Sequence, residues 1–92
     1  MILTFIHKGL EDFFLTASKK GIIPSHQKKL RLQLSALDTA SQITDMNIPG
    51  WDLHELQGDR KGVWSIKVNG NWRVTFKFAD GNAEVVNYED YH

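Results

Sequence analysis

The chain has 92 residues, 41% of them hydrophobic and 24% charged, which is typical of one globular domain over residues 1–92 and not of a disordered chain. It contains no cysteine, which excludes disulfides, thiolate nucleophiles and cysteine-ligated metal clusters. Its formal net charge of zero argues against strong, non-specific binding to free polyanions, because such binding needs many phosphate contacts.

The first half of the chain predicts a strand followed by two helices. Residues 2–6 are an apolar segment that we expect to form a strand. Apolar residues at helical spacing predict one helix that stops near Gly21 and a second that starts near Pro24, giving a helical hairpin over residues 10–40. A further short turn is expected over residues 41–46. The two apolar stripes consist of Leu10, Phe13, Phe14, Ala17, Leu30, Leu34 and Leu37.

The second half predicts a three-stranded antiparallel meander. Residues 63–68 and 72–78 alternate between apolar and polar side chains, as strands do. Asn69-Gly70 between them matches a type I′ hairpin turn. Asp80-Gly81 marks a second tight turn, after which residues 83–89 form the return strand.

The alternation assigns the side chains of this sheet to two faces. The apolar face can be covered by the helices, and residues 53–56 can add an edge strand. The fold class is therefore α+β, with an N-terminal strand and a helical hairpin packed on a twisted, mainly antiparallel sheet. The opposite face, which we expect to be partly wet, carries Lys67, Arg73, Thr75 and Lys77.

Charge is distributed in blocks of alternating sign. The net charge is +3 over residues 1–40, −3 over 41–60, +4 over 61–78 and −4 over 79–92. A folded surface can therefore present a basic patch beside an acidic one. Arg73 and Lys77 lie about 13 Å apart along one strand, so an extended nucleic acid could contact both.

The histidines do not form a metal-binding pattern. None of the four has the HxH or HxxxH spacing of a metal site, so we expect neither a metal nor another cofactor. The chain also lacks a GxSxG nucleophile elbow and a glycine-rich phosphate loop. The apolar N-terminal segment is too short for a signal peptide, and no stretch approaches the roughly 18–20 apolar residues of a membrane helix.

Metal-free acid–base chemistry supported by cations remains. RNA carries its own nucleophile, the 2′-hydroxyl, so a protein needs to supply only a base, an acid for the leaving 5′-oxygen and cations for the phosphate. Arginine suits the last role because it stays charged and can grip a phosphate with two donors. The titratable candidates are His54, Asp90, Tyr91 and His92, and the candidate clamps are Arg60, Lys61 and Arg73.

Two segments carry a family resemblance. Residues 53–76 read LHELQGDRKGVWSIKVNGNWRVTF, and the chain ends NYEDYH. Together they resemble the HigB family of toxins, within the RelE/ParE superfamily, and the resemblance extends over the whole chain in order and length. It implies a small domain like the microbial ribonucleases and the toxin of a type II toxin–antitoxin pair.

The resemblance also implies an activity and partners. Such toxins are ribosome-dependent mRNA endonucleases that cut translated mRNA in the A site of the 70S ribosome, where contacts with 16S rRNA are expected. They are held by a helix-turn-helix antitoxin, here a HigA-like protein, and reach operator DNA only through the antitoxin complex. A bacterial cytoplasmic location and no membrane association follow from this interpretation.

By motif position, the resemblance implies catalytic roles for Arg73, Asp90, Tyr91 and His92, with His54 as a further participant. Relatives commonly carry a basic residue directly before Gly-Asp-Arg, whereas this chain has Gln57, which lacks the positive charge near the phosphate path. The expected substrate-binding residues are Gln57, Arg60, Lys61, Lys67 and Lys77.

Two other functions remain open from the sequence. A ParE-like toxin on the same fold would act on DNA gyrase without cutting RNA, and it would not rely on a terminal catalytic histidine. A catalytically inactive module would only bind an antitoxin, and Gln57 is the one feature that points to it. The assignment of general acid and general base also stays open.

Overall fold

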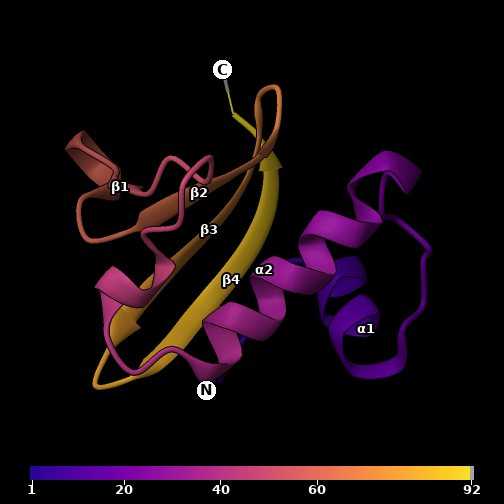
Figure 1. Ribbon diagram of the computed structural model, residues 1–92, viewed down its shortest axis with the longest axis horizontal. Coiled ribbons are helices and arrows are strands. Elements are labelled where there is room, and N and C mark those ends of the chain that lie inside the picture. The colour runs from indigo at the N-terminus through magenta and orange to yellow at the C-terminus, as the bar shows by residue number, and fades with distance from the viewer. Residues whose placement is uncertain (92) are drawn as a thin grey trace.

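The computed structural model describes residues 1–91. Two α-helices, three short 3-10 helices and four β-strands lie within this range (Figure 1). Their bounds are α1 (Lys8–Thr16), η1 (Pro24–His26), α2 (Gln27–Thr39), η2 (Ile43–Met46), β1 (His54–Glu55), η3 (Gly58–Arg60), β2 (Trp64–Asn69), β3 (Trp72–Ala79) and β4 (Asn82–Asp90). The expected α+β class is confirmed.

The four strands form one antiparallel sheet in the order β1-β2-β3-β4. Each strand pairs with its sequence neighbour, as the meander pattern predicts, and β1 is the short edge strand expected over residues 53–56. The predicted N-terminal strand is reduced to two isolated parallel bridges to β4, which are Ile2 to Ala83 and Phe5 to Val86. Figure 1 shows both helices on one side of this sheet.

The first helix ends earlier than its glycine pattern predicts. Its last residue is Thr16, and Ala17 adopts the left-handed conformation with φ 63° while its N–H donates to the Phe13 carbonyl. Gly21 therefore does not terminate the helix, because the chain has already turned four residues before it. At the other end, His7 caps the helix through a hydrogen bond from the Leu10 N–H to its Nδ1 atom, 2.9 Å long.

Both predicted hairpins form, but the first does not have the type I′ turn that we expected for it. In the first, Asn69 pairs with Trp72, so Gly70 and Asn71 are the central residues, and of these Gly70 alone has a positive φ. A type I′ turn needs positive φ at both central residues, so that assignment was wrong. The second hairpin meets this requirement, with φ 54° at Asp80 and 76° at Gly81.

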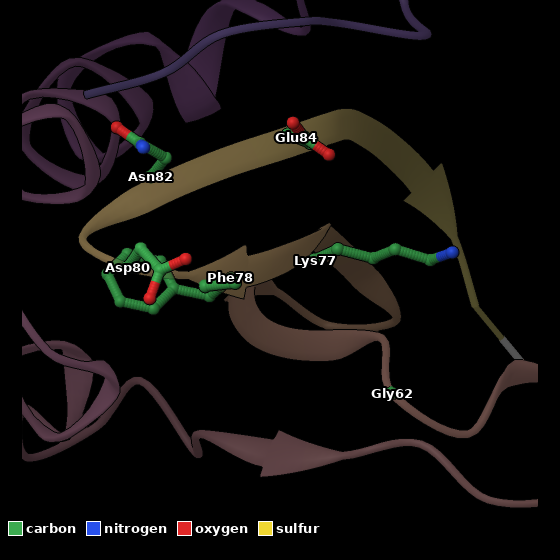
Figure 2. A pocket seen from close by; sticks show the side chains of 7 residues that line it. Gly62, Lys77, Phe78, Asp80, Asn82 and Glu84 are labelled. Atoms are coloured by element: carbon green, nitrogen blue, oxygen red, sulfur yellow. The ribbon is translucent and has the colours of Figure 1, made fainter.

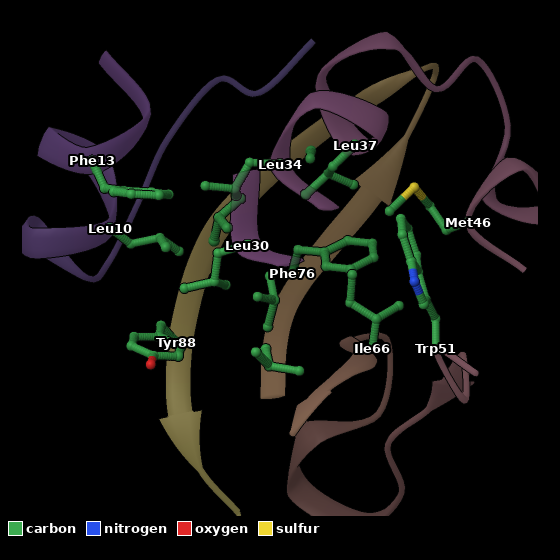
Figure 3. Close-up of a cluster of buried hydrophobic side chains, with 14 of the residues drawn as sticks. Leu10, Phe13, Leu30, Leu34, Leu37, Met46, Trp51, Ile66, Phe76 and Tyr88 are labelled. Carbon is green, nitrogen blue, oxygen red and sulfur yellow. The ribbon is translucent and has the colours of Figure 1, made fainter. Parts of the chain in front are cut away.

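The core lies between the helices and the apolar face of the sheet (Figure 3). Leu30, Leu34 and Leu37 of the predicted α2 stripe are almost fully buried, and so are Ile66 and Phe76 on the sheet. Full burial of a side chain of this kind contributes about 1.5–3 kcal/mol. The helices thus cover one face and leave the other for chemistry. No helix in the described range is both long and apolar enough to cross a membrane.

Candidate active site on the outer face of the sheet

We call the face of the sheet that points away from the helices the outer face. Two cross-strand rows of this face lie at the candidate site, and the pairing register determines their members. One row consists of Lys67, Arg73 and Glu89. The next consists of His54, Ser65, Thr75 and Asn87.

Arg73 lies near the centre of the outer face on β3. Its side chain is only 15% exposed, and its Nη1 atom donates to the Asp52 carboxylate over 3.1 Å. The Nε atom is buried and has no hydrogen-bond partner among residues 1–91. The guanidinium is therefore held in place by packing while part of its donor capacity remains unused.

His54 and Arg73 both contact Asp52. The His54 Nδ1 atom is 3.0 Å from the Asp52 main-chain oxygen and 4.0 Å from its carboxylate. A carbonyl oxygen only accepts, so Nδ1 carries the proton in this contact and the neutral ring keeps its lone pair on Nε2. Asp52, which has a φ of 50°, thus fixes the His54 tautomer and also pairs with Arg73.

A half-buried carboxylate, Glu89, lies next to Arg73 on β4. Arg60 donates to both of its oxygens, over 2.8 and 2.7 Å. Thr75 and Asn87 donate to its Oε2 atom over 2.6 and 3.3 Å. The Arg60 contact is the main reason why the pKa of Glu89 lies below its ordinary value, and the same contact raises the pKa of Arg60.

The C-terminal tail continues from this cluster. The Tyr91 N–H donates to the Asn71 carbonyl over 2.7 Å, which places the tail beside the turn between β2 and β3. Tyr91 is 42% exposed, and its phenol lies within electrostatic range of the Arg60 guanidinium. Asp90 pairs with Trp72, so its side chain starts from the face opposite to that of Glu89. His92, the last of the predicted catalytic residues, lies outside the described residues.

The remaining predicted substrate-binding residues are spread around this cluster. Lys67 is half-buried in the same row as Arg73, whereas Lys61 is exposed in the loop after η3. Gln57 is exposed before η3, and its amide donates to the Glu55 carbonyl over 3.4 Å. Lys77 is exposed further along β3. Only Lys67 therefore shares a row with Arg73.

A separate hollow of about 360 Å³ lies beyond the cluster, towards the second hairpin. Figure 2 shows Lys77 in its lining, with a side chain that extends away from the Asp80 end. The lining mixes a cation with the carboxylates of Asp80 and Glu84, which makes it a poorer site for phosphate than the surroundings of Arg73.

Three side chains of the cluster were missing from the sequence-based site, namely Asp52, Thr75 as a ligand of Glu89, and Glu89 itself. The outer face is also drier than expected, because Thr75 and Ser65 are each only 1% exposed. Strand alternation in β4 would have placed Glu89 on the outer face. No sequence signal joins Asp52 to Arg73, since they are 21 residues apart.

Two of the other histidines have structural contacts instead. His7 caps α1, and His26 is buried against Tyr88, with 2.6 Å between its Nδ1 atom and the tyrosine oxygen. No group of three or more histidine, aspartate or glutamate side chains within residues 1–91 has a metal-binding arrangement.

Comparison with known proteins adds a family. Residues 3–92 match the model described as the RelE-like toxin of the type II toxin–antitoxin system HigB. The chain is 45% identical to the endoribonuclease HigB of Proteus vulgaris over 92 residues, which is the full length of both chains. It is 38% identical to toxin HigB-1 of Vibrio cholerae serotype O1 over 85 residues, 90% of each chain.

Proposed function

The chain belongs to the HigB-like family of RelE-like toxins from type II toxin–antitoxin systems, and from this membership we propose that it is an endoribonuclease that cleaves translated mRNA in the ribosomal A site. The observation that carries the proposal is the cluster in which Asp52 holds both Arg73 and His54 on the outer face. It brings a cation that can bind phosphate next to a base that can take a proton.

The chemistry begins with the 2′-hydroxyl of the mRNA. The neutral His54 ring takes its proton on Nε2, and the resulting 2′-oxygen attacks the adjacent phosphorus. The bond from phosphorus to the 5′-oxygen breaks, and an acid donates a proton to that leaving oxygen. The products are a 2′,3′-cyclic phosphate, open to hydrolysis to the 3′-phosphate, and a 5′-hydroxyl. Every step uses side chains alone.

Arg73 stabilises the charge that builds on the phosphate. Its guanidinium is already positioned, so little reorganisation accompanies the reaction. Its present partner, Asp52, is 59% exposed, and ion pairs in such surroundings are weak. A phosphate oxygen can therefore replace the aspartate as the partner of Arg73.

The tail supplies the acid in this proposal. His92 donates the proton to the leaving 5′-oxygen, with Asp90 and Tyr91 completing the site, as the family motif implies. Tyr91 lies near Arg60, which belongs to the outer-face cluster. Lys61, Lys67, Lys77 and the polar Gln57 bind the mRNA on either side of the scissile phosphate.

The partners follow from the same family. The toxin acts in the bacterial cytoplasm on the 70S ribosome, where it contacts 16S rRNA as well as mRNA. A HigA-like helix-turn-helix antitoxin neutralises it and links it to operator DNA.

The test is to map new mRNA 5′ ends in bacterial cells after a brief pulse of the protein. Wild type is compared with His92→Gln, Arg73→Ala and His54→Gln, and Lys8→Met serves as a charge-loss control on α1, where Lys8 contacts Asp12. We expect cuts confined to translated frames with wild type and the control, and their loss in the three site variants.

Three other results would contradict the proposal. Growth arrest with DNA damage and no new RNA ends would point to the gyrase-directed activity of the ParE branch. Neither new ends nor arrest would indicate a module that only binds its antitoxin. If all three site variants cut like wild type, the assignment of the chemistry to this cluster is wrong.

A further inference from the structure

Glu89 has two arginine neighbours, Arg60, which donates to its carboxylate, and Arg73, which lies opposite it on β3. Arg73 is the direct cross-strand partner of Glu89, and such partners have Cβ atoms about 4.5–5.5 Å apart. Nevertheless, within residues 1–91 Glu89 pairs with Arg60, and Arg73 pairs with Asp52. The nearest strand neighbour of Glu89 is thus not its ion-pair partner.

The two ion pairs differ in their surroundings. Glu89 is 22% exposed and accepts two parallel bonds from Arg60, a geometry that makes the strongest arginine–carboxylate contacts. Asp52 is 59% exposed and accepts a single bond from Arg73. Solvent weakens the second pair far more than the first. Arg60 therefore holds the carboxylate that would bind Arg73 most tightly.

The loop that carries Arg60 is itself tied down. The Val63 N–H donates to the Arg60 carbonyl over 3.0 Å, and the Gly62 N–H donates to the Glu55 carboxylate over 2.9 Å. The first contact closes a turn within the loop, and the second connects the loop to β1. Arg60 is thus presented to Glu89 from a fixed position, and it is half-buried there.

We infer that Arg60 is a positioning residue, which occupies Glu89 so that Arg73 remains available to the scissile phosphate. This inference rests on the proposed nuclease function and replaces the RNA-binding role that the sequence predicts for Arg60, because Arg60 then acts through Glu89 and does not bind RNA itself. Without Arg60, the half-buried Glu89 would keep only the neutral donors Thr75 and Asn87. Its cross-strand neighbour Arg73 has a buried Nε with no partner within residues 1–91, and that cation would then pair with the carboxylate.

The first test reads Arg73 directly and needs no activity. The proton resonance of the Arg73 Nε–H group is measured by NMR in wild type, Arg60→Met and Arg60→Met/Glu89→Gln, with Arg73→Lys used to assign the signal. In Arg60→Met we expect the resonance to move downfield, since Nε now donates to a carboxylate, and to return in the double variant. An unmoved resonance in a folded Arg60→Met protein would overturn the inference.

The second test measures mRNA cleavage on programmed ribosomes. Arg60→Met should cut at least about tenfold more slowly, approaching the 10²–10³-fold loss that accompanies removal of one transition-state donor. Adding Glu89→Gln should recover most of this loss, although it restores no positive charge. Arg60→Lys keeps one charged contact to Glu89, so its cleavage rate should lie between those of wild type and Arg60→Met.

Lys61→Met is the matched control, because it removes one positive charge from the same loop and no contact between Lys61 and Glu89 is found in the described structure. Glu89→Gln should not rescue it. If Arg60→Met and Lys61→Met lose the same cleavage rate, and Glu89→Gln rescues neither, then Arg60 is an RNA-binding cation and the inference is overturned. If wild type does not cut, the nuclease proposal fails, and the NMR result still decides whether Arg60 keeps Glu89 from Arg73.

Discussion

The Nδ1 atom of His26 and the hydroxyl oxygen of Tyr88 lie 2.6 Å apart in the protein interior, where they join the start of α2 to β4. His26 is 4% exposed and Tyr88 is also 4% exposed. Tyr88 directly precedes Glu89, so this contact anchors the strand that carries the outer-face cluster and leads into the tail.

Tyr88→Phe should destabilise the protein without altering its fold. The change leaves a buried imidazole nitrogen without a partner, at a cost of about 1–3 kcal/mol. Urea unfolding followed by circular dichroism measures this. Tyr91→Phe is the control, because Tyr91 is exposed and should shift the unfolding free energy by no more than about 0.5 kcal/mol. Equal stability of the two variants would mean that the His26–Tyr88 contact does not contribute.

Stability should also depend on pH through His26. Burial holds the pKa of His26 below its ordinary value of 6.5, so the unfolded chain binds the proton more readily than the folded one. The stabilisation is complete above about pH 6.5 and is lost as pH falls from there through the folded-state pKa. The unfolding free energy of wild type should therefore decrease over this window, and that of His26→Asn should decrease less.

Stability should also depend on pH through Glu89, over a more acidic range than through His26. Because its pKa is lowered from an ordinary 4.5, its contribution is present above that value and disappears as pH falls through the folded-state pKa. Arg60→Met should weaken this acidic dependence and leave the His26 window unchanged. Unfolding curves at closely spaced pH values separate the two.

Arg73→Met should separate activity from stability. We expect cleavage on programmed ribosomes to fall by about 10²–10³-fold, the cost of losing one donor that acts on the developing charge. The unfolding free energy should change little, because the Arg73 Nε is unpartnered in the described structure and its pair with Asp52 is exposed. A variant that unfolds readily would instead make Arg73 a structural residue.

Gln57→Lys should increase activity modestly. Gln57 is exposed, and a lysine there adds a positive charge near the path of the mRNA. An exposed charge contact contributes about 0.2–1 kcal/mol, which corresponds to a gain of about 1.4- to fivefold in kcat/KM at low salt, lost at high salt. Ser35→Lys, at an exposed site on α2, is the control. The same gain in both variants would reflect general attraction to RNA and not this position.

The elements of the fold were largely predictable because their signals are local. The Leu30, Leu34 and Leu37 stripe depends on the helical repeat, and the hairpins depend on alternation interrupted by turn residues. The end of α1 was not predictable from Gly21, because Ala17 takes up the left-handed conformation itself. The turn at Gly70 likewise follows the pairing of Asn69 with Trp72, which the dipeptide alone does not specify.

The sequence by itself determined the fold class, the family and the residue types available for chemistry, since repeat patterns and motifs are properties of neighbouring residues. Only the tertiary structure decided which of these side chains meet. Asp52 reaches Arg73 across 21 residues, and Arg60 reaches Glu89 across 29. Both meetings depend on strand register and on where the η3 loop lies against the sheet. Packing of the whole domain determines these features, and so it also determines which arginine remains available to a phosphate.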